Sequence, residues 1–354
     1  MAKKATKPQK NLLSKLRHKL VRLQQNFSRR HKEFLARRPH RSFRYSRKRD
    51  YKRSLKLPGY FAFSVEVYKI MASRKGLFLS MALFYGLMTI IFSGLSSQAS
   101  FNSLADSISE AGSDIANGSF VKLLQAGTIA FAVAGGNSQQ LTDVQQVYLV
   151  IIMLLTWLTT VWLLRSILAG ERPRLRDGLY NGAAPLVSTS LVGLLFCLQL
   201  LPIAVLGIAY AGLMNAGQLE NGFGLMLFCA IAVVAISLSL YMICSTLIAL
   251  VIITIPGMYP WTAIKAAGDF VVGRRLRILY RYLWLAGTVV IFWGLMMIPL
   301  ILFVSWLRTK AAWIDIVPIV PIAATIVSAI AVVWSASYVY LLYRKVVADD
   351  AKPA

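Results

Sequence analysis

The residues that could do acid–base, nucleophilic or metal chemistry are few in this 354-residue chain. All histidines lie within the first 40 residues, and the cysteines lie in apolar segments without the paired spacing of a metal or redox site. These residues are His18, His31, His40, Cys197, Cys229 and Cys244. No phosphate-binding loop, HExxH motif or GxSxG motif is present. The sequence therefore favours a protein that is not an enzyme and that uses no cofactor or metal.

Anion binding is the chemistry that the sequence does offer. Between Arg37 and Phe61, arginine and lysine alternate with Phe43, Tyr45 and Tyr51. Cationic side chains neutralise phosphate groups, and aromatic rings can stack on bases. We expect contacts with anionic lipid or nucleic acid at Arg37, Arg38, Arg41, Arg44, Arg47, Lys48, Arg49, Lys52 and Arg53.

This segment belongs to a basic head, residues 1–57, that is largely disordered by composition. Apolar residues from Leu12 to Phe27 fall on one helical face, which predicts an amphipathic helix near 11–27. Three partners fit the head: anionic membrane lipid, RNA or the ribosome, and a partner protein docked on the 11–27 helix. The sequence does not choose among them.

The rest of the chain has the composition of a membrane protein. Hydrophobic residues make up 57% and charged residues only 15%, against about 25% charged in soluble domains. The net charge of +25 is concentrated at the start, because 24 of the 39 Lys and Arg residues lie in the first 75 positions. The protein is thus a cationic head followed by a nearly neutral, apolar body.

Long apolar runs predict how often this body crosses a membrane. A helix of about 20 apolar residues spans a bilayer core. We therefore expect an all-α, polytopic helix bundle over residues 58–345, followed by a short tail, 346–354. The six predicted transmembrane spans are 77–95, 146–169, 185–213, 223–254, 284–307 and 318–343.

Loop charges predict the orientation. With six spans, 36 of the 39 Lys and Arg residues fall on one side, and such residues are retained on the cytoplasmic side. We therefore expect both termini to be cytoplasmic. Basic residues of two loops would then line the inner face: Arg172, Arg174, Arg176, Arg274, Arg275, Arg277 and Arg281.

One loop tests this topology. Residues 119–136, within the first outer loop, are too apolar for a solvated loop and short for a span. We expect an interfacial or re-entrant helix there. If this segment spanned the membrane, every later loop would change sides.

The inner segments resemble one another, which predicts a three-fold parallel repeat. Each unit would consist of an interfacial amphipathic helix, a span, an outer loop and a second span. The first interfacial helix is expected at Tyr60 to Lys75, with a stripe through Phe61, Val67 and Tyr68. The alternative is that basic helices precede the odd spans in any protein that obeys the positive-inside rule.

The layout resembles that of bacterial six-span integral membrane proteins related to the membrane domain of glycerophosphoryl diester phosphodiesterases. The similarity is greatest from Ile255 to Leu285, where Pro256, Pro260, Gly273 and Arg274 fit the outline of that group. The resemblance implies a multi-pass protein of the bacterial inner membrane, and it implies no catalysis because the hydrolase domain is absent. The basic head is not part of the group's pattern.

These features favour a scaffold or accessory factor in envelope or lipid organisation. An alternative is a passive transporter or permease-like protein for a small or lipidic substrate, and a second is a membrane anchor for RNA or ribosomes. An ion-coupled pump is disfavoured because Arg165 is the only charged residue inside the six spans. We expect its side chain to snorkel to the lipid headgroups.

Overall fold

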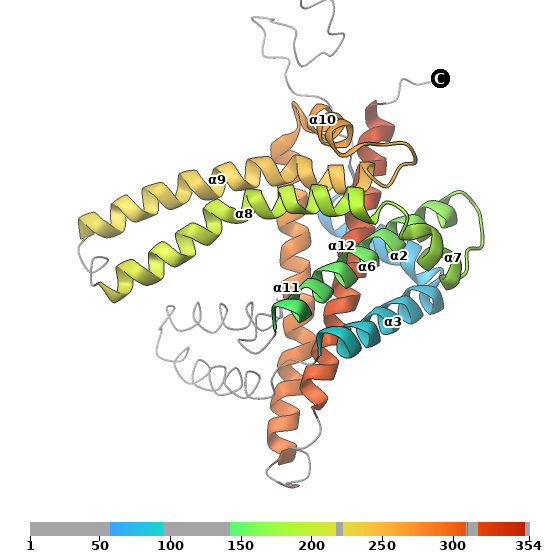
Figure 1. Cartoon of the computed structure of the whole chain (residues 1–354), viewed down its shortest axis with the longest axis horizontal. Helices are drawn as coiled ribbons and strands as arrows, with labels where there is room; N and C mark the ends of the chain where they lie inside the picture. Colours follow the sequence, from blue (N-terminus) through green and yellow to red (C-terminus); the bar gives the residue numbers. More distant parts are fainter. Residues whose placement is uncertain (1–56, 95–141, 217–221, 309, 311–317, 351–354) are drawn as a thin grey trace, which may run out of the picture. The chain divides into compact units, whose positions relative to one another are not determined.

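The computed structural model describes residues 57–94, 142–216, 222–308, 310 and 318–350. The chain divides into two units, 1–54 and 55–354, and every described residue lies in the second. The described residues form nine helices and no strand, which confirms the all-α prediction (Figure 1). The helices are α2 (Tyr60–Ala72), α3 (Lys75–Ser93), α6 (Asp143–Leu168), α7 (Leu175–Gly182), α8 (Leu186–Asn215), α9 (Gly222–Ile252), α10 (Pro260–Val271), α11 (Arg275–Arg308) and α12 (Ile319–Asp350).

Six of these helices are long and apolar enough to cross a membrane, as the sequence predicted. They are α3, α6, α8, α9, α11 and α12. The largest difference from the predicted bounds is in α11, which begins at Arg275 rather than near residue 284. Gly273, at φ +83°, lies just after the end of α10. The basic residues that follow it form the first turns of α11 and are continuous with its apolar part.

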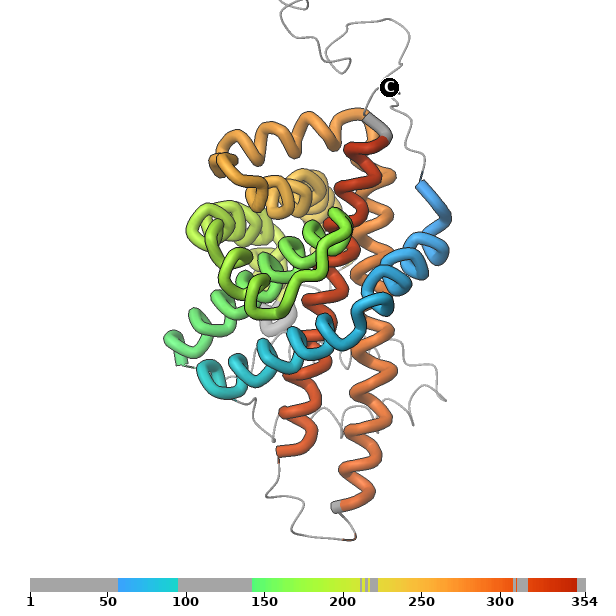
Figure 2. The backbone as a smooth tube through the Cα atoms, turned by 90° about the vertical axis from the view of Figure 1, so that its right-hand side faces the viewer, coloured from blue at the N-terminus to red at the C-terminus, as the bar shows by residue number. Residues whose placement is uncertain are grey.

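The order of the helices repeats three times. A short helix is followed by two long ones in α2–α3–α6, in α7–α8–α9 and in α10–α11–α12. The order can be followed along the tube in Figure 2, which is coloured from blue at the N-terminus to red at the C-terminus. Only two or three residues separate each short helix from the span that follows it. The order is that of the predicted parallel repeat.

The helix contacts are also cyclic. Each short helix packs on the last span of the preceding unit: α7 on α6, α10 on α9, and α2 on α12. The first span of each unit contacts its own partner and that same preceding span: α3 contacts α6 and α12, α8 contacts α9 and α6, and α11 contacts α12 and α9. Equivalent neighbours in all three units support a repeat better than helix order alone.

Burial in the short helices follows one register. The fourth residue of each short helix is buried, and so is the eighth. A spacing of four residues places both on one helical face. These pairs are Phe63 and Val67 in α2, Gly178 and Gly182 in α7, and Ala263 and Ala267 in α10. The residue sizes differ between units although the positions agree.

The first spans share a register too. Their fourth and seventh residues are buried in every unit. At the seventh position the residues are Met81 in α3, Val192 in α8 and Arg281 in α11. Arg281 is therefore a charged residue at a position that is apolar in the other two units.

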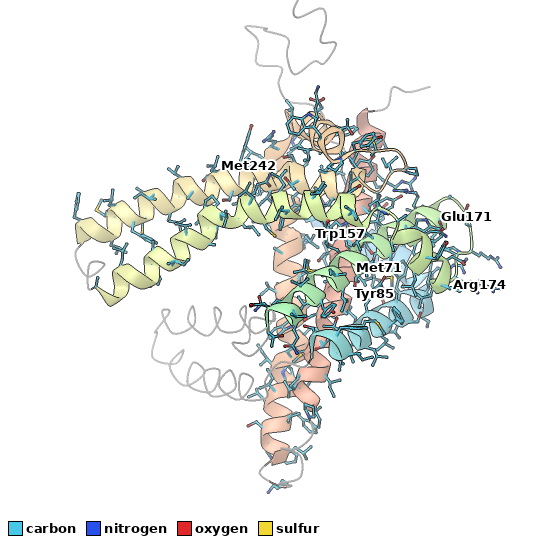
Figure 3. The ribbon with its side chains drawn as sticks, viewed as in Figure 1. Met71, Tyr85, Trp157, Glu171, Arg174 and Met242 are labelled. Atoms are coloured by element: carbon cyan, nitrogen blue, oxygen red, sulfur yellow. The ribbon has the colours of Figure 1, made fainter. Side chains whose placement is uncertain are left out.

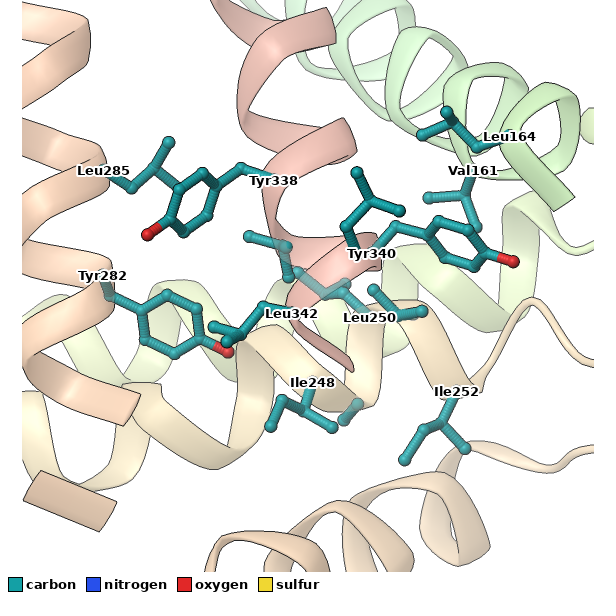
Figure 4. Close-up of a cluster of buried hydrophobic side chains, with 14 of the residues drawn as sticks. Val161, Leu164, Ile248, Leu250, Ile252, Tyr282, Leu285, Tyr338, Tyr340 and Leu342 are labelled. Carbon is teal, nitrogen blue, oxygen red and sulfur yellow. The ribbon is translucent and has the colours of Figure 1, made fainter. Parts of the chain in front are cut away.

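The main core lies where the second spans of the three units meet. Side chains from α6, α9, α11 and α12 converge there, including Leu164, Ile252, Tyr282 and Leu342 (Figure 4). A smaller apolar cluster lies between α11 and α12 around Met297. The helical conformation of these spans lets most backbone groups bond within each helix, as a membrane requires.

The face that α2 buries overlaps only in part with the expected stripe, because Val67 belongs to both. Phe63 and Val67 point into the core, whereas Phe61 and Tyr68 are exposed. The sequence pattern did not separate these two faces because both are apolar. α2 therefore presents one apolar face to the protein and a second one away from it.

Candidate anionic-lipid interface

The predicted anion-binding residues of the head, from Arg37 to Arg53, lie outside the described residues, as do the 11–27 helix and the 119–136 segment. The seven predicted inner-face arginines are all described. In the structure, some of these side chains are exposed and the others bond to neighbouring parts of the protein. Among these seven described arginines, only the exposed side chains are free to bind a phosphate group without breaking a contact within the protein.

The exposed set is Arg172, Arg174, Arg176 and Arg277. Three of them surround the start of α7, where the Asp177 carboxylate accepts a hydrogen bond from the Arg174 backbone N–H at 3.0 Å. This contact caps the helix through the backbone of Arg174, as an acidic residue near a helix N-terminus commonly does. Figure 3 shows Arg174 at the start of α7. These guanidinium groups are accessible to phosphate groups.

Arg274 and Arg275 contact the protein. Arg274 is only 2% exposed, and its Nε donates to the Phe270 carbonyl at 2.8 Å, near the C-terminus of α10. Arg275 lies over the ring of Tyr241, 3.8 Å from its centroid, and its Nη1 donates to the Tyr241 carbonyl at 3.2 Å. These contacts tie the start of α11 to α10 and α9.

Arg281 holds the start of α2. It is 7% exposed, and its guanidinium donates to the backbone carbonyls of Pro58 and Gly59, the latter at 3.3 Å. The guanidinium carbon also lies 4.2 Å from the centroid of the Tyr60 ring. This buried cation thus binds neutral groups from the segment that joins the head to the membrane domain.

The Arg165 side chain, which the sequence predicts to snorkel to the lipid headgroups, makes hydrogen bonds within the protein. Its guanidinium donates to the carbonyl of Thr254 at 3.1 Å and to the Thr254 hydroxyl at 2.6 Å. Thr254 follows the last turn of α9, where unpaired carbonyls favour a cation. The sequence did not predict this pairing because the two residues lie 89 positions apart.

Exposed aromatic residues mark all three short helices. Phe61 on α2 is 73% exposed, Tyr180 on α7 is 84% exposed and Trp261 on α10 is 76% exposed. Tyr68 on α2 and Tyr259 at the start of α10 are exposed as well. The tyrosine and tryptophan rings of this set have a polar edge, and such rings are enriched at the membrane–water boundary. The sequence pattern singled out Phe61 and Tyr68 in the expected stripe of the first short helix, but not the exposed aromatic residues of the other two short helices.

Within the described residues, His, Cys, Asp and Glu side chains form no group of three that could hold a metal ion. Comparisons of the chain with protein-family models, with curated proteins and with solved structures found no match. The likeness to the six-span bacterial group therefore stays a prediction. The fold and its six candidate spans define the class: a polytopic integral membrane protein.

Proposed function

We propose that the protein is a non-enzymatic membrane scaffold that gathers anionic lipid at the cytoplasmic face of a bacterial inner membrane. The observation that supports this most is that α2, α7 and α10 each carry exposed aromatic residues, with exposed arginines beside α7 and on α11. Rings of this kind favour the headgroup layer, and cations attract anionic lipid there at about 1 kcal/mol each. The basic head would add to the same attraction.

The orientation belongs to the same proposal. The charge partition supports a cytoplasmic position for both termini and for the three short helices. Lipid contact would then be made at three equivalent places in the repeat. Because flexible, exposed arginines do not fix the geometry of a headgroup, the protein would select lipids by charge rather than by headgroup structure.

The test is lipid enrichment around the full-length protein. The protein is reconstituted in a mixture of phosphatidylglycerol and phosphatidylcholine, extracted mildly, and the retained lipids are measured by mass spectrometry. We expect phosphatidylglycerol to exceed its share in the mixture. Replacing the four exposed arginines by glutamine should lower the affinity for phosphatidylglycerol by roughly fivefold for each arginine that binds a headgroup.

The matched control replaces three glutamines or serines elsewhere and leaves the charge unchanged; Gln146, Ser190 and Ser245 are suitable positions for alanine. Equal retention of the two lipids by the native protein would contradict the proposal. A short reporter fused after residue 354 tests the orientation separately, since its appearance on the periplasmic side of the membrane would refute the assigned topology.

A further inference from the structure

The three short helices occupy equivalent places but are held by different kinds of contact. In α7, a Cβ at Gly182 would lie 3.0 Å from Thr159 Cα, so the two backbones touch. In α10 the buried pair is Ala263 and Ala267. In α2 the same positions hold Phe63 and Val67, which keep its backbone away from α12.

The contacts that specify the position of α2 are polar. Arg281 binds the carbonyls of Pro58 and Gly59, and Trp284 Nε1 donates to the Ser64 hydroxyl at 3.0 Å. The Lys345 ammonium lies 2.8 Å from the Glu66 carboxylate, and both side chains are more than a third exposed. α2 is thus fastened at its start to α11 and at its middle to α12.

Polar contacts matter more for α2 than burial of its apolar face does. In a bilayer, lipid chains are as apolar as a protein core, so helix association gains little from the hydrophobic effect. Phe63 and Val67 can exchange most of their apolar contacts for acyl chains, and the specific contact that is then lost is the edge-to-face packing of Phe63 on Tyr338, with ring centroids 4.8 Å apart. The close backbone contact of α7 has no such substitute, because its van der Waals contacts depend on shape.

An anionic headgroup competes directly for the groups that hold α2. A phosphodiester whose charge is not offset by a choline cation accepts charge-assisted, bidentate hydrogen bonds from a guanidinium, whereas the carbonyls of Pro58 and Gly59 are neutral acceptors. It also competes with Glu66 for Lys345. In addition, the segment before residue 57 carries 21 Lys and Arg residues and only two acidic residues, so an anionic surface attracts the chain that leads into α2.

We propose that Arg281 and Lys345 are two exchange points, each of which binds either its partner at α2 (the carbonyls of Pro58 and Gly59, or Glu66) or the phosphate of an anionic phospholipid. Anionic lipid releases α2 from α11 and α12, and neutral lipid leaves it docked. This inference rests on the proposed lipid contact and adds a conformational consequence to it. α7 and α10 stay docked in both states.

The test is hydrogen–deuterium exchange of the full-length protein in nanodiscs of phosphatidylcholine or phosphatidylglycerol. We expect backbone amides of α2 to exchange about tenfold faster in phosphatidylglycerol, because two charge-assisted hydrogen bonds are broken. The amides of α7 serve as the internal reference and should not change. Equal exchange of α2 in the two lipids would overturn the proposal.

Two variants separate these exchange points from the lipid-gathering surface. Arg281→Met should make α2 exchange fast in phosphatidylcholine, and it should lower phosphatidylglycerol enrichment by no more than the one headgroup that Arg281 binds, because the four exposed arginines remain. Arg277→Met, one turn earlier on α11, should lower the enrichment and leave α2 protected in phosphatidylcholine. Continued protection of α2 in Arg281→Met overturns the exchange points, whereas absent enrichment in the native protein overturns the proposed function.

A third arm distinguishes lipid phosphate from free phosphate. Inorganic phosphate is added to nanodiscs of phosphatidylcholine at the concentration that the charged headgroups reach in the other arm. We expect no change in α2 exchange, because a dissolved ion is not held at the depth of Arg281. Acceleration by inorganic phosphate would overturn the assignment to lipid.

Discussion

α7 and α2 occupy the same place in successive units, yet they are attached by opposite means. α7 packs through glycines against the backbone of α6, and its Gly178 leaves room for Leu163, whose side chain a Cβ would meet at 2.9 Å. α2 packs through Phe63 and Val67 and is fixed by a buried arginine, a tryptophan N–H and one ion pair.

The difference teaches that the repeat and the side chains determine separate properties. The repeat register specifies where a short helix lies and which of its residues face inward. The size of those residues and their polar neighbours determine how firmly the helix is held and what can release it. A close-packed helix responds to shape, and a helix held by charges responds to salt and lipid.

The largest effect is expected from Gly182→Val. The new side chain would meet the Thr159 backbone, which cannot move as a flexible side chain does, so α7 must shift away from α6. We expect the free energy of unfolding to fall by about 3 kcal/mol, the upper end for overpacked sites. The midpoint of thermal unfolding in mild detergent measures this loss.

Gly268→Ala is the matched control, because it adds a methyl to another short helix where no atom lies within 4 Å of the new Cβ. Alanine favours helix by about 1 kcal/mol over glycine, so this variant should be neutral or more stable. Equal losses in the two variants would show that the glycine contact with α6 is not what holds α7.

A smaller effect is expected from Thr159→Val. The Thr159 hydroxyl shares a 2.6 Å hydrogen bond with the Tyr85 hydroxyl of α3, while the shape that Thr159 presents to α7 is nearly unchanged by valine. Hydrogen bonds between membrane helices contribute about 0.6 kcal/mol on average and up to about 1.7. We expect the free energy of unfolding to fall by about 1 kcal/mol, with the amides of α7 still protected from exchange.

Thr160→Val is the reference variant, since the Thr160 hydroxyl donates to the Thr156 carbonyl within its own helix at 2.6 Å and reaches α3 only through a weak contact with Met81 Sδ at 3.9 Å. Its loss should be smaller than that of Thr159→Val. If the amides of α7 exchanged faster in Thr159→Val, the attachment of α7 would depend on hydrogen bonding as that of α2 does, and the contrast between the two helices would fail.

Most of the fold could be predicted from the sequence because a bilayer requires spans to be apolar helices of a minimum length. Apolar runs long enough for a bilayer located the six spans to within a few residues, apart from the start of α11 and the end of α12, which runs on to Asp350. At the start of α11, the helix continues through Arg275, Arg277 and Arg281, and hydropathy cannot detect a helix that is polar at one end. The order of short and long helices followed from the same patterns.

The candidate site was less predictable. Arg277 and Arg281 are one turn apart and look alike in sequence, but one is exposed and the other is buried against Pro58 and Gly59. That difference depends on a contact across more than 200 positions, which one sequence does not reveal. Likewise, α2 has two apolar faces, and only packing shows which of them is buried.

Trp284→Phe tests the polar attachment of α2 at a single neutral hydrogen bond. Phenylalanine keeps an aromatic ring beside Tyr60, whose centroid lies 5.8 Å from that of Trp284, but it cannot donate to Ser64. We expect α2 amides to exchange roughly threefold faster in phosphatidylcholine nanodiscs. Trp306→Phe, at the far end of α11, is the control and should leave α2 unchanged.

The smallest effect is expected from Glu66→Gln, which removes the ion pair with Lys345 and preserves the shape of the side chain. Exposed pairs of this kind contribute about 0.5 kcal/mol at low salt, so α2 amides should exchange about twofold faster.

Because salt screens exposed charges, NaCl at about 1 M should accelerate α2 exchange in the native protein and have less effect in the variant. α7 has no charge pair in its contact with α6 among the described residues, so its exchange should not respond to salt. An equal salt response of α2 and α7 in the native protein would mean that both helices are held in the same way, and the contrast drawn from their inward residues would then be wrong.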